Sequence, residues 1–117
     1  MADSVGLDKI VAELNRLYAL YKEDRYKASP LLAAMVAAGK VRATVSALAS
    51  GAALGFGFGE IVGVVAALTP RDFYKSMTTH ADHRVWQDVY RPKTPVGEVY
   101  LKLTVLDDVL IVSFKGL

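Results

Sequence analysis

The sequence predicts an α+β fold in which N-terminal helices pack on a C-terminal antiparallel β-sheet. Helical periodicity and helix-capping residues precede residue 70, whereas apolar and polar residues alternate in short runs after it. Helices followed by strands are the order expected of an α+β domain. The chain has 117 residues, 53% of them apolar, which suits a single domain over residues 1–117 with one modest core.

The first helix is expected within residues 7–21. Apolar residues there follow three- and four-residue steps, as on one face of an amphipathic helix: Leu7, Ile10, Leu14, Leu17 and Tyr21. We interpret residues 1–27 as an N-terminal helical extension of the domain. Packing of this stripe on the domain is the simplest interpretation, and dimerisation or docking of a partner protein are the alternatives.

Two shorter helices are expected next. Ser29 and Pro30 suit an N-cap and a first-turn proline, and Gly39 ends the apolar segment that follows. Thr44 or Ser46 is placed to cap a short third helix.

The most apolar stretch, residues 52–68, predicts a buried helix over 59–68 that ends at Thr69 and Pro70. The stretch contains four glycines and Glu60 and is at the lower limit of length for a bilayer span. We therefore expect no contact with a membrane, and a membrane protein is the alternative.

Four strands are expected beyond residue 70, in the segments DFYKSMT, RVWQDVY, VYLKLTVL and VLIVSFK. The third shows the clearest period of two, and the DD pair after it predicts a two-residue hairpin turn. The loops THADH and PKTP separate the earlier strands. We expect a four-stranded antiparallel meander with one face on the helices and the other in solvent.

Residue counting from these turns places a row of polar side chains on the solvent face. The DD turn puts Tyr100 opposite Lys115, with Lys102 on the same face. A four-residue PKTP loop puts Gln87 opposite Tyr100, and a three-residue loop within THADH aligns Lys75 with Gln87. The sequence thus predicts a phenol, an amide and ammonium groups on one face.

These groups suit RNA cleavage without a metal ion. Such cleavage needs the 2′-hydroxyl deprotonated, the charge of the pentacoordinate phosphate neutralised and the leaving 5′-oxygen protonated. Positioned cations and acid/base groups perform these tasks, and lysine and tyrosine side chains qualify for them. Because the unperturbed pKa values of lysine and tyrosine are about 10, proton transfer at neutral pH requires a pKa lowered by burial or by a neighbouring cation.

Each of these residues also has an ordinary structural interpretation. Lys115 near the end of an edge strand is typically a solvated charge that discourages aggregation. Tyr100 opposite Lys115 is an ordinary cross-strand pair, and Gln87 and Lys75 are ordinary exposed strand residues.

The same register places three further residues on the face toward the helices. Trp86 and Tyr90 are expected to be core residues rather than base-stacking platforms. Asp88 would be buried beside them and would need a partner such as Arg91 or a backbone donor.

The composition narrows the class of protein. The chain has no cysteine, and its N-terminus does not read as a secretory signal, so we expect a cytoplasmic protein without disulfides or thiolate metal sites. His80 and His83 suggest a metal site or an acid/base pair, but no third ligand accompanies them, so we expect no metal and no cofactor. The net charge of +2 permits a nucleic-acid partner without demonstrating one.

Several blocks are similar to those of the MqsR family, the motility and quorum-sensing regulator toxins of the wider RelE-like group. They are KVRATVSAL, FYKSMTT, DHRVWQDVYRP, GEVYLKLTV and DVLIVSFK, and the resemblance covers about residues 30–116. It implies a RelE-like ribonuclease toxin fold and a sequence-preferring endoribonuclease, an mRNA interferase. Such a toxin cleaves mRNA and inhibits translation and growth until an antitoxin of the MqsA type neutralises it, so we expect a monomer or a toxin–antitoxin heteromer.

The resemblance assigns catalysis to the four residues of the row reached from the strand register: Lys75, Gln87, Tyr100 and Lys115. His83 and Arg91 also match family positions, and we expect them and Lys102 to bind RNA. The alternative function is a non-cleaving nucleic-acid-binding protein, or a regulatory protein in a complex with its antitoxin. The presence of all four polar residues favours the enzyme.

Overall fold

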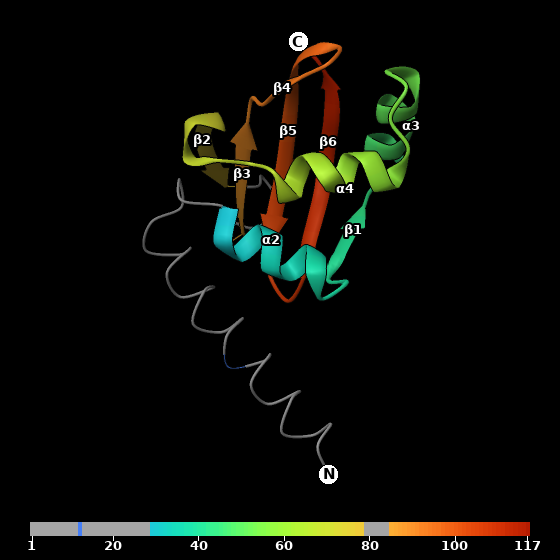
Figure 1. The fold of residues 1–117 in the computed structure, drawn as a ribbon. Coiled ribbons are helices and arrows are strands. Elements are labelled where there is room, and N and C mark those ends of the chain that lie inside the picture. The colour runs from blue at the N-terminus through green and yellow to red at the C-terminus, as the bar shows by residue number, and fades with distance from the viewer. Residues whose placement is uncertain (1–11, 13–28, 79–84) are drawn as a thin grey trace.

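A computed structural model describes residue 12 and residues 29–78 and 85–117 of the chain (Figure 1). Its elements in chain order are α2 (Ser29–Ala37), β1 (Val41–Ala43), α3 (Val45–Ala53), α4 (Phe58–Ala66), the 3-10 helix η1 (Pro70–Asp72), β2 (Phe73–Thr78), β3 (Trp86–Tyr90), β4 (Lys93–Thr94), β5 (Gly97–Val105) and β6 (Val109–Gly116). The α+β class is confirmed. The expected helix over 7–21, the extension over 1–27 and both histidines, His80 and His83, lie outside the described residues, apart from residue 12.

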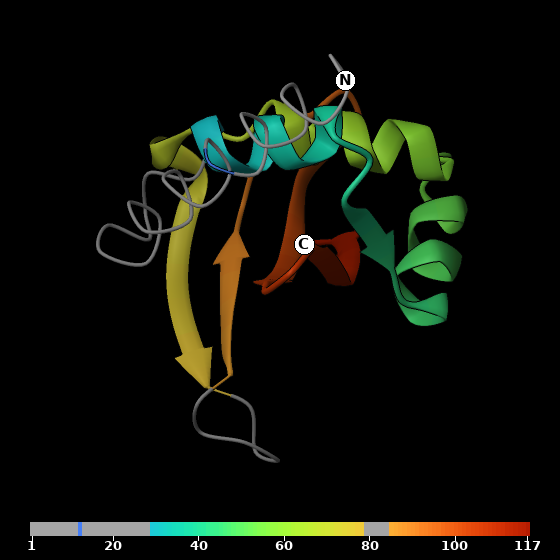
Figure 2. The same cartoon turned by 90° about the horizontal axis from the view of Figure 1, so that it is seen from below.

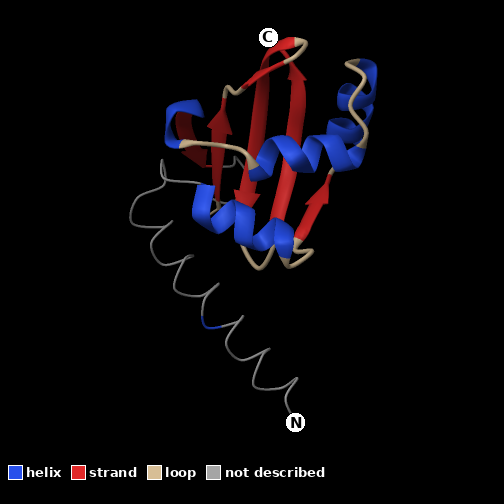
Figure 3. Ribbon diagram, viewed as in Figure 1, coloured by secondary structure: helices blue, strands red, loops and turns tan. Residues whose placement is uncertain are grey.

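Four strands form the antiparallel meander that the sequence predicts. The order of the sheet is β1-β6-β5-β3-β2, and the short β4 pairs with β5 (Figure 3). The strand β1 was not predicted. It lies parallel to the first half of β6, with Val41 opposite Val109, at one edge of the sheet.

A salt bridge ties β1 to the loop before β6. Arg42 Nε lies 2.6 Å from Asp108 Oδ2, and by accepting this hydrogen bond the Asp108 carboxylate raises the pKa of Arg42. The Lys40 carbonyl accepts a hydrogen bond from the N–H of Val109 at the start of the parallel pairing. At three residues, β1 is too short to show a period of two in the sequence.

Helices α2 and α4 cover one face of the sheet, and α3 packs beside β6 (Figure 2). Between the layers lies an apolar core, whose burial is the main source of folding free energy. Its fully buried side chains come from both layers: Leu32, Ile61, Val65, Leu101, Leu103, Ile111 and Phe114. None of the described helices covers the opposite face, which we call the outer face.

The C-terminal end of α2 and the N-terminal end of α3 follow capping residues expected from the sequence. Gly39 has a φ of +74°, and the residue after it donates its N–H to the Met35 carbonyl, which closes α2. Thr44 is the N-cap of α3: its hydroxyl accepts from the Ala47 N–H at 3.1 Å and donates to the Val112 carbonyl at 3.0 Å.

Helix α4 is the helix expected over 59–68, and it faces the core on one side only. Ile61 and Val65 are fully buried, whereas Glu60 and Gly63 are exposed. Within the described residues no single helix is long and apolar enough to cross a bilayer, and α3 with α4 meets that criterion only as a pair bent by 96°.

The predicted two-residue turn between β5 and β6 is wrong. The hairpin has the predicted pairing far from the turn, including Tyr100 opposite Lys115. Beyond Lys102 the register shifts by one residue because Val112 forms a β-bulge. The loop therefore contains the three residues 106–108.

The predicted register of β3 on β5 is also wrong. Tyr90 lies opposite Leu101, where the prediction required Gly97, a displacement of four residues. The hairpin is longer than expected because the PKTP segment continues it through β4 instead of forming the loop. Gln87 is therefore not opposite Tyr100.

Lys75 is likewise misplaced by the prediction, since it lies opposite Val89 rather than Gln87. Both register errors are even numbers of residues. Because strand side chains alternate between faces, Lys75 and Gln87 remain on the predicted outer face.

The three residues expected on the helix side have different outcomes. Tyr90 is fully buried, as predicted. Asp88 is 4% exposed and accepts a hydrogen bond from the Ser76 hydroxyl. Trp86 is 44% exposed, so its predicted core position is wrong, because β2 and β3 extend beyond the layer formed by α2 and α4 at this end (Figure 2).

Candidate functional site

A row of opposed residues crosses the outer face on neighbouring strands. Lys75 on β2 lies opposite Val89 on β3, Val89 opposite Lys102 on β5, and Lys102 opposite Ser113 on β6. Neighbouring strands are about 5 Å apart, and opposed residues project on the same face. The row therefore holds two lysines, separated by the buried side chain of Val89.

Tyr100 lies beside this row, between two ammonium groups. The Nζ atom of Lys115 is 5.1 Å from the centroid of the Tyr100 ring, and that of Lys102 is 5.9 Å from it. At these distances a cation is attracted to the electron-rich face of an aromatic ring. The β5–β6 pairing thus holds a phenol and two lysines together on regular strands.

Gln87 occupies a different place from the one predicted. It is half-buried, lies opposite Met77, and is two residues from Val89 along β3. The register puts Gln87 and Tyr100 on opposite sides of Lys102. Lys102 is therefore the residue that connects the predicted set.

The outer face carries uncompensated positive charge. Lys75, Lys102 and Lys115 form no ion pair with any described residue. The carboxylate of Glu98, on the same side of β5, is engaged by Arg91: Arg91 Nε lies 2.8 Å from Glu98 Oε1, an ion pair rather than a well-aligned hydrogen bond. An anionic substrate would therefore meet free ammonium groups here.

This arrangement is suited to a phosphate ester. Ammonium groups can neutralise the charge of a pentacoordinate phosphate, and the Tyr100 hydroxyl can donate or accept a proton beside them. In the part of the chain that the structure describes, no group of three His, Cys, Asp or Glu side chains is placed to bind a metal ion.

The residues expected to bind RNA fall in different places. Lys102 lies beside Tyr100 on the outer face, Arg91 contacts the ring of Tyr74, and His83 is outside the described residues. Sequence reasoning did not single out Tyr74, which is 53% exposed, with Lys75 Nζ 5.6 Å and Arg91 Cζ 5.1 Å from its ring centroid. The irregular alternation of DFYKSMT is the sequence signal from which a bulge near Tyr74 could have been predicted.

Comparisons with known proteins identify the family to which the chain belongs. The family model described as "Motility quorum-sensing regulator, toxin of MqsA" matches residues 10–116. The match begins inside the N-terminal extension, earlier than the resemblance that we noted in the sequence. The protein named "mRNA interferase toxin MqsR" of Escherichia coli (strain K12) is 57% identical over 81 residues, which are 69% of this chain and 83% of that protein.

The family match includes the strands that carry the lysines and Tyr100. Because the family model matches nearly the whole chain and the relative is 57% identical, the chain belongs to the MqsR toxin family.

Proposed function

We propose that this protein is a toxin that cleaves mRNA in the cytoplasm as a sequence-preferring, metal-independent endoribonuclease, and that an antitoxin of the MqsA type neutralises it. The observation that carries the proposal is the Tyr100 ring, with the ammonium groups of Lys102 and Lys115 at 5.9 Å and 5.1 Å from its centroid, on a sheet face that none of the described helices covers. Its support is the membership of the chain in a family described as the toxin of MqsA and the name of its relative, an mRNA interferase.

The reaction follows from the groups on the outer face. The 2′-hydroxyl of the nucleotide before the cleaved bond loses its proton to a base and attacks the phosphorus. The P–O5′ bond breaks, and the leaving oxygen takes a proton from an acid. The products are a 2′,3′-cyclic phosphate and a 5′-hydroxyl, and no water is consumed in this step.

The residues take the following roles. Lys75 and Lys115 neutralise the charge that develops on the phosphorane, and Tyr100 transfers a proton as acid or base. Gln87 orients the RNA backbone. Lys102 acts as a third cation beside Lys75 and Lys115, because the register places it between Tyr100 and Gln87.

The remaining RNA-binding residues act at the periphery. Arg91 is already paired with Glu98, so it offers hydrogen bonds and ring contacts more than net charge. His83 is retained as an RNA-binding residue on the family resemblance alone. The protein works as a monomer or as one component of a toxin–antitoxin heteromer.

The test is cleavage of a defined mixed-sequence single-stranded RNA in EDTA, with the cut positions mapped. We expect cleavage by the parent protein and a loss of about 100-fold or more in Tyr100→Phe and Lys75→Ala. Lys40→Ala is the matched control, because Lys40 is an exposed lysine at the end of α2, and it should cleave as the parent does. Circular dichroism checks that each variant is folded.

Two outcomes would contradict the proposal. If folded parent protein leaves RNA intact but still binds it, the protein is a non-cleaving nucleic-acid-binding module. If Tyr100→Phe and Lys75→Ala cleave at the parent rate, cleavage occurs elsewhere than the outer face.

A further inference from the structure

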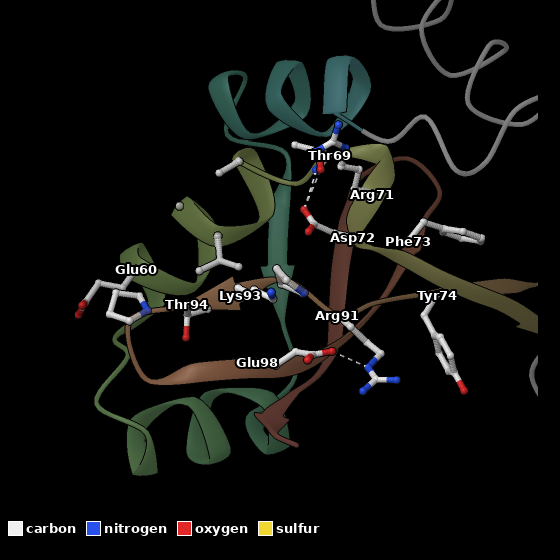
Figure 4. Close-up of a pocket in the computed structure, with 15 residues that line it drawn as sticks. Glu60, Thr69, Arg71, Asp72, Phe73, Tyr74, Arg91, Lys93, Thr94 and Glu98 are labelled. Atoms are coloured by element: carbon white, nitrogen blue, oxygen red, sulfur yellow. Dashed lines mark hydrogen bonds and ion pairs between the residues drawn. The ribbon is translucent and has the colours of Figure 1, made fainter.

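A second concave surface lies at the end of the sheet, between α4, η1 and the β3–β5 hairpin (Figure 4). It has a volume of about 1020 Å³. Among the residues that line it are Arg71, Tyr74, Arg91 and Lys93. We call this surface the end groove.

The carboxylates that line the end groove are all engaged within the chain. Glu60 Oε1 accepts a hydrogen bond from the N-cap N–H of α4 at 3.1 Å. Asp72 Oδ2 accepts one from the Thr69 N–H at 2.9 Å, and Glu98 is paired with Arg91 (Figure 4). Each of these carboxylates therefore has an oxygen already bound to a donor within the fold.

Two cations of the end groove have no such partner. Arg71 and Lys93 are exposed and form no ion pair with any residue that the structure describes. The lining holds three acids and three bases, and Arg71 and Lys93 are the bases whose donors no described residue uses, so these two side chains are available to a phosphate group.

The aromatic ring of Tyr74 stands at one side of the end groove. In the pairing of β2 with β3, Phe73 lies opposite Tyr90 and Lys75 opposite Val89, which are adjacent in β3. Tyr74 is therefore a bulged residue with no residue opposite it in β3. Phe73 packs edge-on against Tyr90, whereas Tyr74 is 53% exposed. An exposed ring flanked by cations is a platform on which a nucleobase can stack.

The end groove is continuous with the outer face. Lys75 follows Tyr74 in β2, and its Nζ atom lies 5.6 Å from the Tyr74 ring. Arg91 Cζ lies 5.1 Å from the same ring, and Arg91 follows β3 directly. The end groove and the outer face therefore meet at Tyr74 and Lys75.

We propose that the end groove binds the nucleotides of single-stranded RNA that flank the cleaved bond, and this rests on the proposed function. A flanking base stacks on Tyr74, and the phosphates beyond it contact Arg71 and Lys93. The end groove thus determines affinity for RNA longer than the cleaved site, while the outer face carries out the reaction.

The test compares two RNAs that share one mapped cut site, one with about six added nucleotides on each side and one without them. For Tyr74→Ala and for Arg71→Ala/Lys93→Ala we expect KM for the long RNA to rise about 10-fold with kcat unchanged. Both variants should cleave the short RNA as the parent does. Tyr74→Phe keeps the ring and should restore the parent KM, and Trp86→Ala, which removes an exposed ring outside the end groove, should leave both RNAs unaffected.

Several results would overturn the inference. If both groove variants cleave the long RNA with the parent KM, the proposed function stands and the end groove does not bind RNA. The same conclusion follows if the variants lose only binding of the antitoxin. If Tyr74→Ala lowers cleavage of both RNAs equally, Tyr74 acts by positioning Lys75. If the parent cleaves neither RNA, the proposed function fails and this inference fails with it.

Discussion

Lys102 lies on the outer face with Tyr100 on one side of it along β5 and Gln87, from β3, on the other. Counting from a two-residue DD turn paired Tyr100 with Lys115 correctly because two errors cancel: the loop has three residues, and the bulge at Val112 restores the counted register beyond it. Gln87 could not be placed, because its register depends on how far the PKTP segment extends the hairpin, and loop length is not encoded in alternation. The predicted set therefore shares the outer face but has Lys102 at its centre.

This central position predicts a catalytic effect for Lys102. We expect Lys102→Ala and Lys115→Ala each to lower kcat by about 100-fold, because each removes one cation beside the phosphorane. Single-turnover cleavage of the minimal RNA at saturating protein measures it. A rise in KM with kcat unchanged would instead make Lys102 a binding residue only.

The hydrogen bond between Ser76 and the buried Asp88 predicts an effect of Asp88 on stability rather than on cleavage. Asp88→Ala should lower the free energy of unfolding by about 1–3 kcal/mol, because it leaves the part-buried Ser76 hydroxyl without its acceptor. Asp107→Ala, at an exposed residue of the β5–β6 loop, is the control and should change it by less than about 0.5 kcal/mol. Urea unfolding measures both, and equal stabilities would contradict the assigned hydrogen bond.

At the level of elements, helix ends were predictable and strand registers were less so. Gly39 and Thr44 act through local backbone hydrogen bonds, so their roles can be read from a few adjacent residues. The bulge at Val112 could not be predicted, because β6 is apolar at nearly every position before it. Such a pattern does not distinguish one register from the next. The strand β1 was missed because it is short and pairs with a distant segment.

The contact of α3 with α4 predicts opposite effects for one substitution at two helical glycines. A Cβ atom on Gly51 would lie 2.5 Å from Ile61 Cδ1, so Gly51→Ala should destabilise the protein by about 1–3 kcal/mol. At Gly63 in α4 a Cβ atom meets nothing within 4 Å, so Gly63→Ala should stabilise it by about 0.5–1 kcal/mol. Thermal unfolding of the two variants measures both, and effects of the same sign would refute this packing.

At the scale of the molecule, none of the described helices covers the outer face, because α2 and α4 lie on the other side of the sheet. The sequence predicted this division, because alternating strands and amphipathic helices require one covered and one uncovered face. It did not predict the end groove, whose walls come from α4, η1 and the β3–β5 hairpin, segments far apart along the chain.

The unpaired lysines of the outer face predict salt-sensitive cleavage. The slope of log kcat/KM against log salt should be negative, with a contribution of about −0.7 for each phosphate contacted on single-stranded RNA. Lys102→Ala should make the slope shallower by about that amount, whereas Arg42→Ala, which removes a cation already paired with Asp108, should not change it. A slope near zero for the parent protein would contradict electrostatic binding on this face.

The measurement that tests the account most directly is cleavage of an RNA carrying a single 2′-deoxynucleotide immediately before a mapped cut. In EDTA we expect the parent protein to leave that bond intact, to cut the all-ribose RNA there, and to produce 2′,3′-cyclic phosphate and 5′-hydroxyl ends. Tyr100→Phe should produce neither end on either RNA. Cleavage at the deoxynucleotide, or cleavage that EDTA abolishes and Mg²⁺ restores, would contradict 2′-hydroxyl attack directed by the outer-face lysines and Tyr100.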